Sequence, residues 1–160
     1  MLTRIIAVLA VALAVAACAE PVKPIRAWSA ATAAAASVGS VTIVNRATNA
    51  PEGGIQALQT ALDQKMAQCA QGPNKYEMQV RVDNYKMANS GGVMLIGDNH
   101  EIAAEVKLVD PANNSVVAEY YVQETTSGGG LIGLAQLSGG TRAISTDFAK
   151  SVCEKIFGKK

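Results

Sequence analysis

The 160-residue sequence has few of the side chains on which most metal and catalytic sites depend. It contains one histidine, His100, and three cysteines, and these do not occur at the spacing of a zinc site. No motif specifies a Ser-His-Asp arrangement or a working pair of carboxylates. We therefore expect no metal, no cofactor and no enzymatic activity. His100 is interpreted as a solvated loop histidine, and an enzyme built around it is the alternative.

An excess of charge of one sign is also lacking. The chain has 14 lysines and arginines against 13 aspartates and glutamates, a formal net charge of +1. Loss of Arg4 with an N-terminal signal makes the two numbers equal. A chain without a basic excess or a polybasic segment does not favour nucleic acid as a partner.

The apolar run near the N-terminus is too short to cross a membrane comfortably. It extends from Ile5 to Ala17, thirteen residues, whereas a membrane-spanning helix needs about 20. Arg4 precedes it, and a positive start followed by a short apolar centre is typical of a secretion signal. We assign residues 1–17 to a signal peptide.

The signal ends on Val15-Ala16-Ala17-Cys18, which resembles the lipobox of bacterial lipoproteins. The resemblance implies that Cys18 begins the mature chain and carries covalent lipid, since several acyl chains anchor a protein stably. The residue after the cysteine is Ala19. In enterobacterial lipoproteins, an aspartate at this position resembles a signal for retention in the inner membrane. Ala19 therefore favours a periplasm-facing location on the outer membrane over the inner membrane. An ordinary signal peptide with a chance cysteine is the alternative.

Residues 18–40 are expected to form a flexible tether. Pro21 and Pro24 interrupt regular structure, and the alanine-serine tract has no periodic apolar face. Trp28, the only tryptophan, either lies at the lipid interface or docks on the folded domain. Residues 41–160 are long enough for one domain with its own core.

The first half of this domain shows a strand, a helix and a second strand. Residues 41–45 are a short β-branched run. Apolar side chains then recur on one helical face, before Gly72-Pro73 ends the helix: Ile55, Leu58, Leu62, Met66 and Cys69. Strict alternation over residues 76–83 predicts a strand, and its slip at Asn84 predicts a bulge.

The second half shows a hairpin and a helix. Alternation through residues 102–108, the polar turn of residues 110–115 and the run of residues 116–123 predict two paired strands. Residues 141–157 form a helix with an apolar face of Ile144, Phe148, Val152 and Ile156. The fold class is therefore α+β, with two helices on one face of a four-stranded, mainly antiparallel sheet in the order β-α-β-β-β-α.

Two cysteines remain once Cys18 is lipidated. An isolated pair in the oxidising periplasm is a disulfide candidate. Cys69 and Cys153 each lie on or beside the apolar side of a predicted helix, and two helices on the same face of a sheet can bring them together. The alternative is two buried thiols that never meet.

Two segments repeat one motif, SGGVMLIG at residues 90–97 and SGGGLIG at residues 127–133. In a strand meander both lie at the same end of the sheet, where their aliphatic residues form either a partner or lipid contact surface or a cap on the core. The contact residues of this hypothesis are Val93, Met94, Leu95, Ile96, Leu131, Ile132, Leu134 and Leu137. Gly128, Gly130 and Gly133 also match a nucleotide-binding motif, but no further strand follows, so we expect no nucleotide.

The order of elements behind the lipobox, including the hairpin VDPANNSVVAEY, is similar to that of small envelope lipoproteins, many of them in uncharacterised families. Its shape resembles the lipopolysaccharide-assembly lipoproteins, which plug or chaperone an outer-membrane barrel, and the curli secretion-channel lipoproteins. AEPVKP after Cys18 departs from the Gly-Phe and Pro-Leu pattern of the first group, and the loops are too short for the long hairpins of the second.

These resemblances imply a non-enzymatic, lipid-anchored accessory or scaffold component of an outer-membrane assembly, with an envelope protein as its partner. The alternative is a periplasmic module that binds a lipid or a small ligand, with the glycine-rich loops as the mouth of its pocket.

Overall fold

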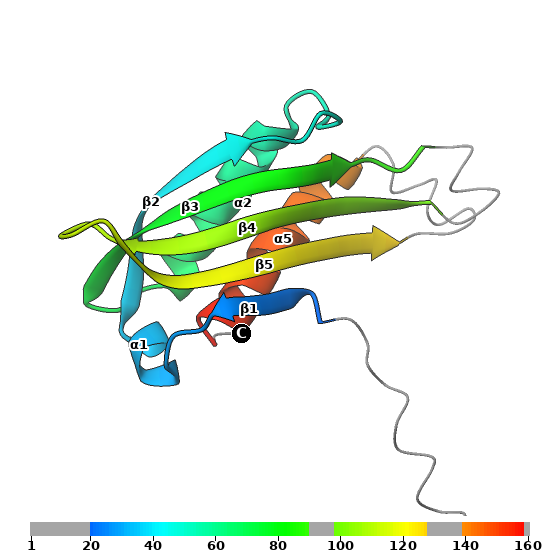
Figure 1. Ribbon diagram of the computed structural model, residues 1–160. Coiled ribbons are helices and arrows are strands. Elements are labelled where there is room, and N and C mark those ends of the chain that lie inside the picture. Colours follow the sequence, from blue (N-terminus) through cyan, green and yellow to red (C-terminus); the bar gives the residue numbers. More distant parts are fainter. Residues whose placement is uncertain (1–19, 90–97, 128–138, 159–160) are drawn as a thin grey trace, which may run out of the picture.

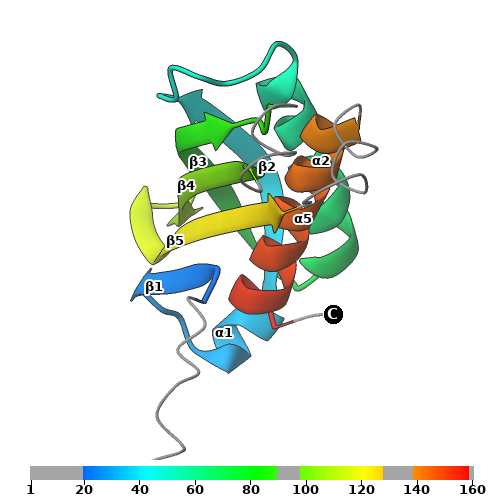
Figure 2. The same ribbon diagram turned by 90° about the vertical axis from the view of Figure 1, so that its right-hand side faces the viewer.

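The structure is a computed structural model that describes residues 20–89, 98–127 and 139–158. The elements of these residues are β1 (Val22–Arg26), α1 (Ala30–Ala34), β2 (Ala36–Asn45), α2 (Gly54–Cys69), β3 (Asn74–Lys86), β4 (Asn99–Asp110), β5 (Ser115–Ser127) and α5 (Gly140–Ile156). The strands form one sheet in the order β1-β5-β4-β3-β2, and α2 and α5 pack together on one face (Figures 1 and 2). The predicted α+β class and the two layers are confirmed.

The predicted four-stranded sheet is wrong, because the sheet has a fifth strand at its edge. β1 pairs antiparallel with β5, with Val22 opposite Val122. The strand lies in the segment expected to be a flexible tether, where Pro24 conceals it in the sequence pattern. An edge strand tolerates proline because only one of its sides makes ladder hydrogen bonds.

The sheet is mixed, and the helix α1 was also missed. β2 begins at Ala36, five residues before the predicted strand, and runs parallel to β3 with α2 as the crossover. α1 precedes β2, and Ser29 caps it by accepting a hydrogen bond from the backbone N–H of Thr32. Regular structure therefore starts at Val22, and residues 22–40 belong to the folded domain.

The helical faces predicted from the sequence form the core. On α2, Leu58, Leu62, Met66 and Cys69 are buried and Ile55 is half-buried, and on α5 all four predicted apolar residues are buried. The sheet contributes further buried side chains to the same cluster: Met78, Val80, Val82, Tyr85, Ile102, Ala104, Val106, Leu108, Ala118, Tyr120 and Val122. In the described part of the chain, no helix is long and apolar enough to cross a membrane.

Two irregularities of the strands follow the sequence. The register of β3 against β4 shifts between Val82 and Asn84, as the slip in alternation predicts, and Tyr85 is thereby fully buried. The β4–β5 turn closes with Asx hydrogen bonds, in which Asp110 accepts from the backbone N–H of Ala112 at 2.9 Å.

Trp28 docks on the domain, which was one of its two predicted positions. Its indole Nε1 donates a hydrogen bond to the carbonyl oxygen of Ile156 at 2.8 Å, at the end of α5. Its ring makes edge-to-face contacts with Tyr76 and Phe157, at centroid distances of 5.7 and 5.4 Å. Trp28 therefore fastens the N-terminal segment to the end of the helical layer.

The disulfide between Cys69 and Cys153 stays a prediction. Both side chains are buried, each in the last turns of its helix. α2 and α5 run in the same direction, because residues early in both helices line one groove and later residues of both line the next. We expect both thiols to resist alkylation in denatured, unreduced protein and to react after reduction, as peptide mass spectrometry would measure. Alkylation of both without reductant would contradict the bond.

Candidate functional site

The two glycine-rich segments attach at one end of the sheet. Asn99, the first residue of β4, pairs with Ser127, the last residue of β5, and β3 ends beside them at Lys86 (Figure 1). The strand order therefore places the attachment points of both segments together, as predicted. The predicted contact residues themselves lie outside the described residues, and their role stays a prediction: Val93, Met94, Leu95, Ile96, Leu131, Ile132, Leu134 and Leu137.

Asp98 joins the two ends of the first segment. Its carboxylate pairs with the ammonium of Lys86 and accepts hydrogen bonds from the backbone N–H of Asn89 at 3.1 Å and of Asn99 at 3.0 Å. The hydrogen bond from Lys86 lowers the pKa of Asp98, so the carboxylate stays ionised at neutral pH. These contacts hold residues 89 and 98, which flank residues 90–97 in the sequence, close to each other.

The end of β5, where the second segment leaves the domain, is held against α5. Thr126, near the end of β5, donates a hydrogen bond to Asp147 of α5 at 3.1 Å. Ser151 of α5 donates to Glu124, whose pKa is raised by burial. These side chains hold the end of β5 against α5, next to the point where residues 128–138 begin.

His100 is buried, which shows that its interpretation as a solvated loop histidine is wrong. Only 5% of it is exposed, and its Nδ1 accepts a hydrogen bond from the backbone N–H of Ala88 at 3.1 Å. The neutral ring then carries its proton on Nε2. The ring packs on the first residue of α5, since a Cβ on Gly140 would lie 2.5 Å from Nε2. Ile102 and Ala104 both point toward the core, and every second residue of a strand lies on the same face. Extending this alternation back by two residues would have predicted that His100 also points inward.

Lowering the pH is expected to destabilise the protein through His100. Burial lowers the pKa of His100, and the charge of Asp98 only partly opposes this. The unfolded chain therefore takes up this proton at higher pH than the folded chain. The free energy of unfolding should decrease as the pH falls below about 6.5, until the folded histidine is also protonated. Denaturant unfolding at a series of pH values measures the slope.

The control for this prediction is His100→Asn, whose amide oxygen can still accept the N–H of Ala88. The raised pKa of Glu124 gives an opposite slope above about 4.5, but it is present in both proteins. The difference between the two pH profiles therefore isolates the histidine. Identical profiles would show that His100 does not titrate differently on folding.

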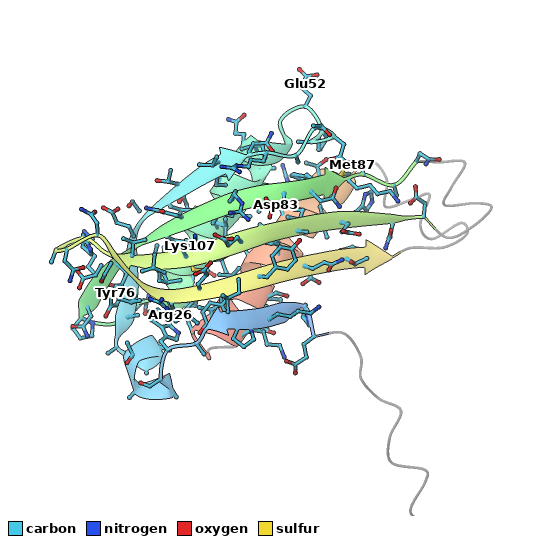
Figure 3. The ribbon with its side chains drawn as sticks, in the orientation of Figure 1. Arg26, Glu52, Tyr76, Asp83, Met87 and Lys107 are labelled. Carbon is cyan, nitrogen blue, oxygen red and sulfur yellow. The ribbon has the colours of Figure 1, made fainter. Side chains whose placement is uncertain are left out.

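The outer face of the sheet carries paired charges of both signs. Arg81 bridges Asp83 and Glu105, both at 2.9 Å, and Lys107 bridges Glu105 and Glu119. Figure 3 shows Asp83 and Lys107 on this face, away from the helices. Solvated pairs of this kind contribute little stability. Among the described residues, no three His, Cys, Asp or Glu side chains form a group that could hold a metal ion.

An apolar groove lies between β1, α1 and the end of α5, where the sequence predicted only a tether. Its volume is about 520 Å³, within the range of ligand pockets. Apolar side chains line most of it, including Val22, Trp28 and Phe157, while Glu20 and Lys155 supply charged groups. The alanines of α1 leave this space open because their side chains are small. The groove was missed because it exists only once residues 22–34 fold onto the sheet.

No protein-family model matches the chain, and no curated protein matches its sequence. Among solved structures, it is similar to a candidate lipoprotein from Caulobacter crescentus, with a TM-score of 0.54 and 14% identity over 81% of this chain and 96% of that one. It is also similar to a DUF330 protein from Xanthomonas campestris, with a TM-score of 0.54 and 11% identity over 76% of this chain and 84% of that one.

A third similarity is weaker. The PelC dodecamer from Paraburkholderia phytofirmans gives a TM-score of 0.43 and 14% identity over 82% of this chain and 96% of that one. A score this low supports no argument about shared structure. At such identities the Caulobacter and Xanthomonas proteins establish a common fold and nothing about activity.

Proposed function

We propose that the protein is a non-enzymatic, lipid-anchored protein of the cell envelope, an accessory or scaffold component of an outer-membrane assembly. The lipobox ending at Cys18 supports the lipid anchor. The fold, which is shared with a candidate lipoprotein, is compatible with it. The scaffold role rests mainly on one observation, the attachment of both glycine-rich segments to the same end of the sheet.

The hydrogen bonds at that end suit the presentation of a contact surface. Asp98 closes the base of one segment, and the hydrogen bonds from Thr126 and Ser151 fix β5 to α5 beside the other. A preorganised frame reduces the conformational entropy that binding must overcome. Apolar residues presented together on such a frame are typical of a protein contact site.

The lipid anchor is tested at Cys18. In cells supplied with labelled palmitate, Cys18→Ser should abolish incorporation of the label, because the thiol that accepts lipid is gone. Ala19→Ser changes the adjacent residue by one hydroxyl and should leave labelling intact. Labelling of Cys18→Ser at the wild-type level would overturn the anchor.

The partner surface is tested by photo-crosslinking in cells. A crosslinking amino acid at Asn89 or Ala143, two exposed positions beside the glycine-rich segments, should capture an envelope protein. The matched control is the exposed Ala112, in the β4–β5 turn at the opposite end of the sheet. Equal capture from all three positions, or none from the first two, would remove the support for this surface.

A lipid- or small-ligand-binding role is the second candidate, and the apolar groove favours it. Native mass spectrometry of the unlipidated mature chain, prepared without detergent, should then show a retained apolar ligand. A spectrum of the bare chain alone would count against a tightly bound ligand.

A further inference from the structure

The early start of regular structure places the folded domain close to any lipid carried by Cys18. The carbonyl oxygen of Pro21 accepts a hydrogen bond from the backbone N–H of Gln123 at 2.7 Å, which fixes Pro21 to β5. Only residues 19 and 20 lie between Cys18 and this point. A chain covers at most about 3.5 Å per residue, so Cys18 is on the order of 10 Å from Pro21. A lipid anchor at Cys18 would therefore hold the domain within about this distance of its membrane.

The edge of the sheet at this point is unsuited to pairing with another strand. β1 has only five residues, Pro24 lacks a backbone N–H, and the register shift between Pro24 and Arg26 makes Ile25 a bulge residue. Short strands, prolines, bulges and charges are the features that prevent edge-to-edge association. A protein strand is therefore a poor occupant of this edge.

The same edge carries an exposed apolar residue between cations. Ile25 is 59% exposed, and among the described residues only Ile25 and Val44 are large hydrophobic residues with such exposure. Lys23 and Arg26 lie on either side of it in the sequence, and both are exposed, although the Arg26 guanidinium also donates a hydrogen bond to the carbonyl oxygen of Val116 at 2.7 Å. An apolar side chain flanked by lysine and arginine matches the boundary between acyl chains and anionic headgroups.

The apolar groove continues from this edge. Val22 and Pro24 of β1 form part of its lining, and Ala30 and Ala34 of α1 form another part. Lys155 adds a further cation at its rim, opposed there by Glu20 alone. The groove therefore offers an apolar interior with one lysine and one glutamate in its lining, and Val22 and Pro24 connect it to the edge strand that carries Lys23.

We propose that the β1–α1 side of the domain is a membrane-facing surface and that the groove takes up one acyl chain of an anionic phospholipid. Burial of the chain against the groove supplies the apolar contact, and the exposed Lys23 and Lys155 supply cations for the headgroup phosphates. The short link to Cys18 raises the effective concentration of the bilayer at this surface. The inference rests on the proposed lipid anchor for its orientation.

Trp28 gives a direct test, because it is the only tryptophan and it lines the groove. The mature chain from residue 18, carrying Cys18→Ser and therefore unlipidated, is mixed with anionic phosphatidylglycerol vesicles whose acyl chains are brominated. Bromine quenches tryptophan on contact, so fluorescence should fall relative to vesicles without bromine. Equal fluorescence with both kinds of vesicle, at lipid concentrations where the chain is bound, would overturn acyl-chain uptake.

Two sets of variants separate the groove from the surface. Ala30→Leu with Ala34→Leu fills the groove and should abolish most of the quenching while vesicle binding persists. Lys23→Gln and Lys155→Gln should each weaken binding to the vesicles about fivefold, since each lysine near an anionic surface contributes about that factor. Lys65→Gln, on α2 away from this side, is the matched control and should bind normally.

Contradictory outcomes are equally specific. Full quenching in the filled variant, with an unchanged unfolding transition, would show that the chain does not enter the groove. Equal losses for Lys65→Gln and Lys23→Gln would show that this side is not the contact surface. Because the assay uses unlipidated protein, its failure is independent of palmitate labelling at Cys18, which tests the anchor itself.

Discussion

Gly72→Ala is expected to destabilise the protein by about 3 kcal/mol. A Cβ at this position would lie 2.0 Å from the carbonyl carbon of Ala35 and 2.5 Å from the backbone nitrogen of Ala36. These are backbone atoms, so no side-chain rotation can relieve the clash. The same stretch is held by hydrogen bonds from Gly72 to the carbonyl of Ala36 and from Asn74 to the carbonyl of Ala35, both at 2.9 Å.

The cost is large because two connecting segments of the fold pack against each other at Gly72, and moving Gly72 would push them apart. The link between α2 and β3 crosses the junction of α1 and β2 at this point, and the parallel pairing of β2 with β3 begins beside it, at Ala36 and Asn74. Denaturant unfolding followed by Trp28 fluorescence measures the loss. Gly139→Ala is the matched control, since its Cβ would meet nothing within 4 Å, and it should cost less than about 1 kcal/mol. Equal stability of both variants would contradict this explanation.

Trp28→Ala is expected to cost about 3 kcal/mol, at the lower end of the range for buried tryptophan because the side chain is half-buried. The substitution removes the edge-to-face contacts with Tyr76 and Phe157. It also deprives the carbonyl of Ile156 of its indole donor. Because α1 and β1 adjoin this residue, we expect the N-terminal segment to loosen before the rest of the domain.

Circular dichroism during denaturant unfolding measures the effect without the tryptophan signal. Trp28→Phe is the intermediate variant, since it keeps an aromatic ring for the contacts with Tyr76 and Phe157 but lacks the N–H donor. The missing hydrogen bond should cost about 1 kcal/mol and the smaller ring somewhat more, so the total should stay below the cost of Trp28→Ala. Hydrogen exchange should show faster exchange for residues 22–38 in Trp28→Ala. Unchanged stability of the alanine variant would mean that this segment is not fastened by Trp28.

Much of the fold was predictable because individual helices and strands bury one face of apolar side chains, and this face is visible as a periodic pattern in the sequence. The periodic residues of α2, such as Leu58 and Leu62, and the alternating residues of β4, such as Ile102 and Val106, are all buried as predicted. Their patterns are local, so a single sequence displays them. The bulge after Val82 was predictable for the same reason, since it interrupts a strict alternation.

The errors concern residues whose position depends on distant partners. β1 contains Pro24 and two charged residues, and nothing in its sequence indicates a strand until β5 is beside it. His100 is polar and precedes the clear part of its strand, yet Ala88 and Gly140 enclose it. A polar side chain is buried where another group hydrogen-bonds to it, and for His100 that group, the N–H of Ala88, lies outside its own strand.

For the candidate site, the sequence by itself determined the resemblance of residues 15–18 to a lipobox, the two glycine-rich segments and the succession of strands that brings their ends together. These are covalent or local properties, expressed by spacing and alternation. Only the tertiary structure decided that residues 22–40 belong to the domain, because an edge strand and a short alanine helix are stable only when β5, Trp28 and α5 hold them. That same packing creates the groove and leaves only residues 19 and 20 between Cys18, the proposed site of lipid attachment, and the first residue hydrogen-bonded to the sheet.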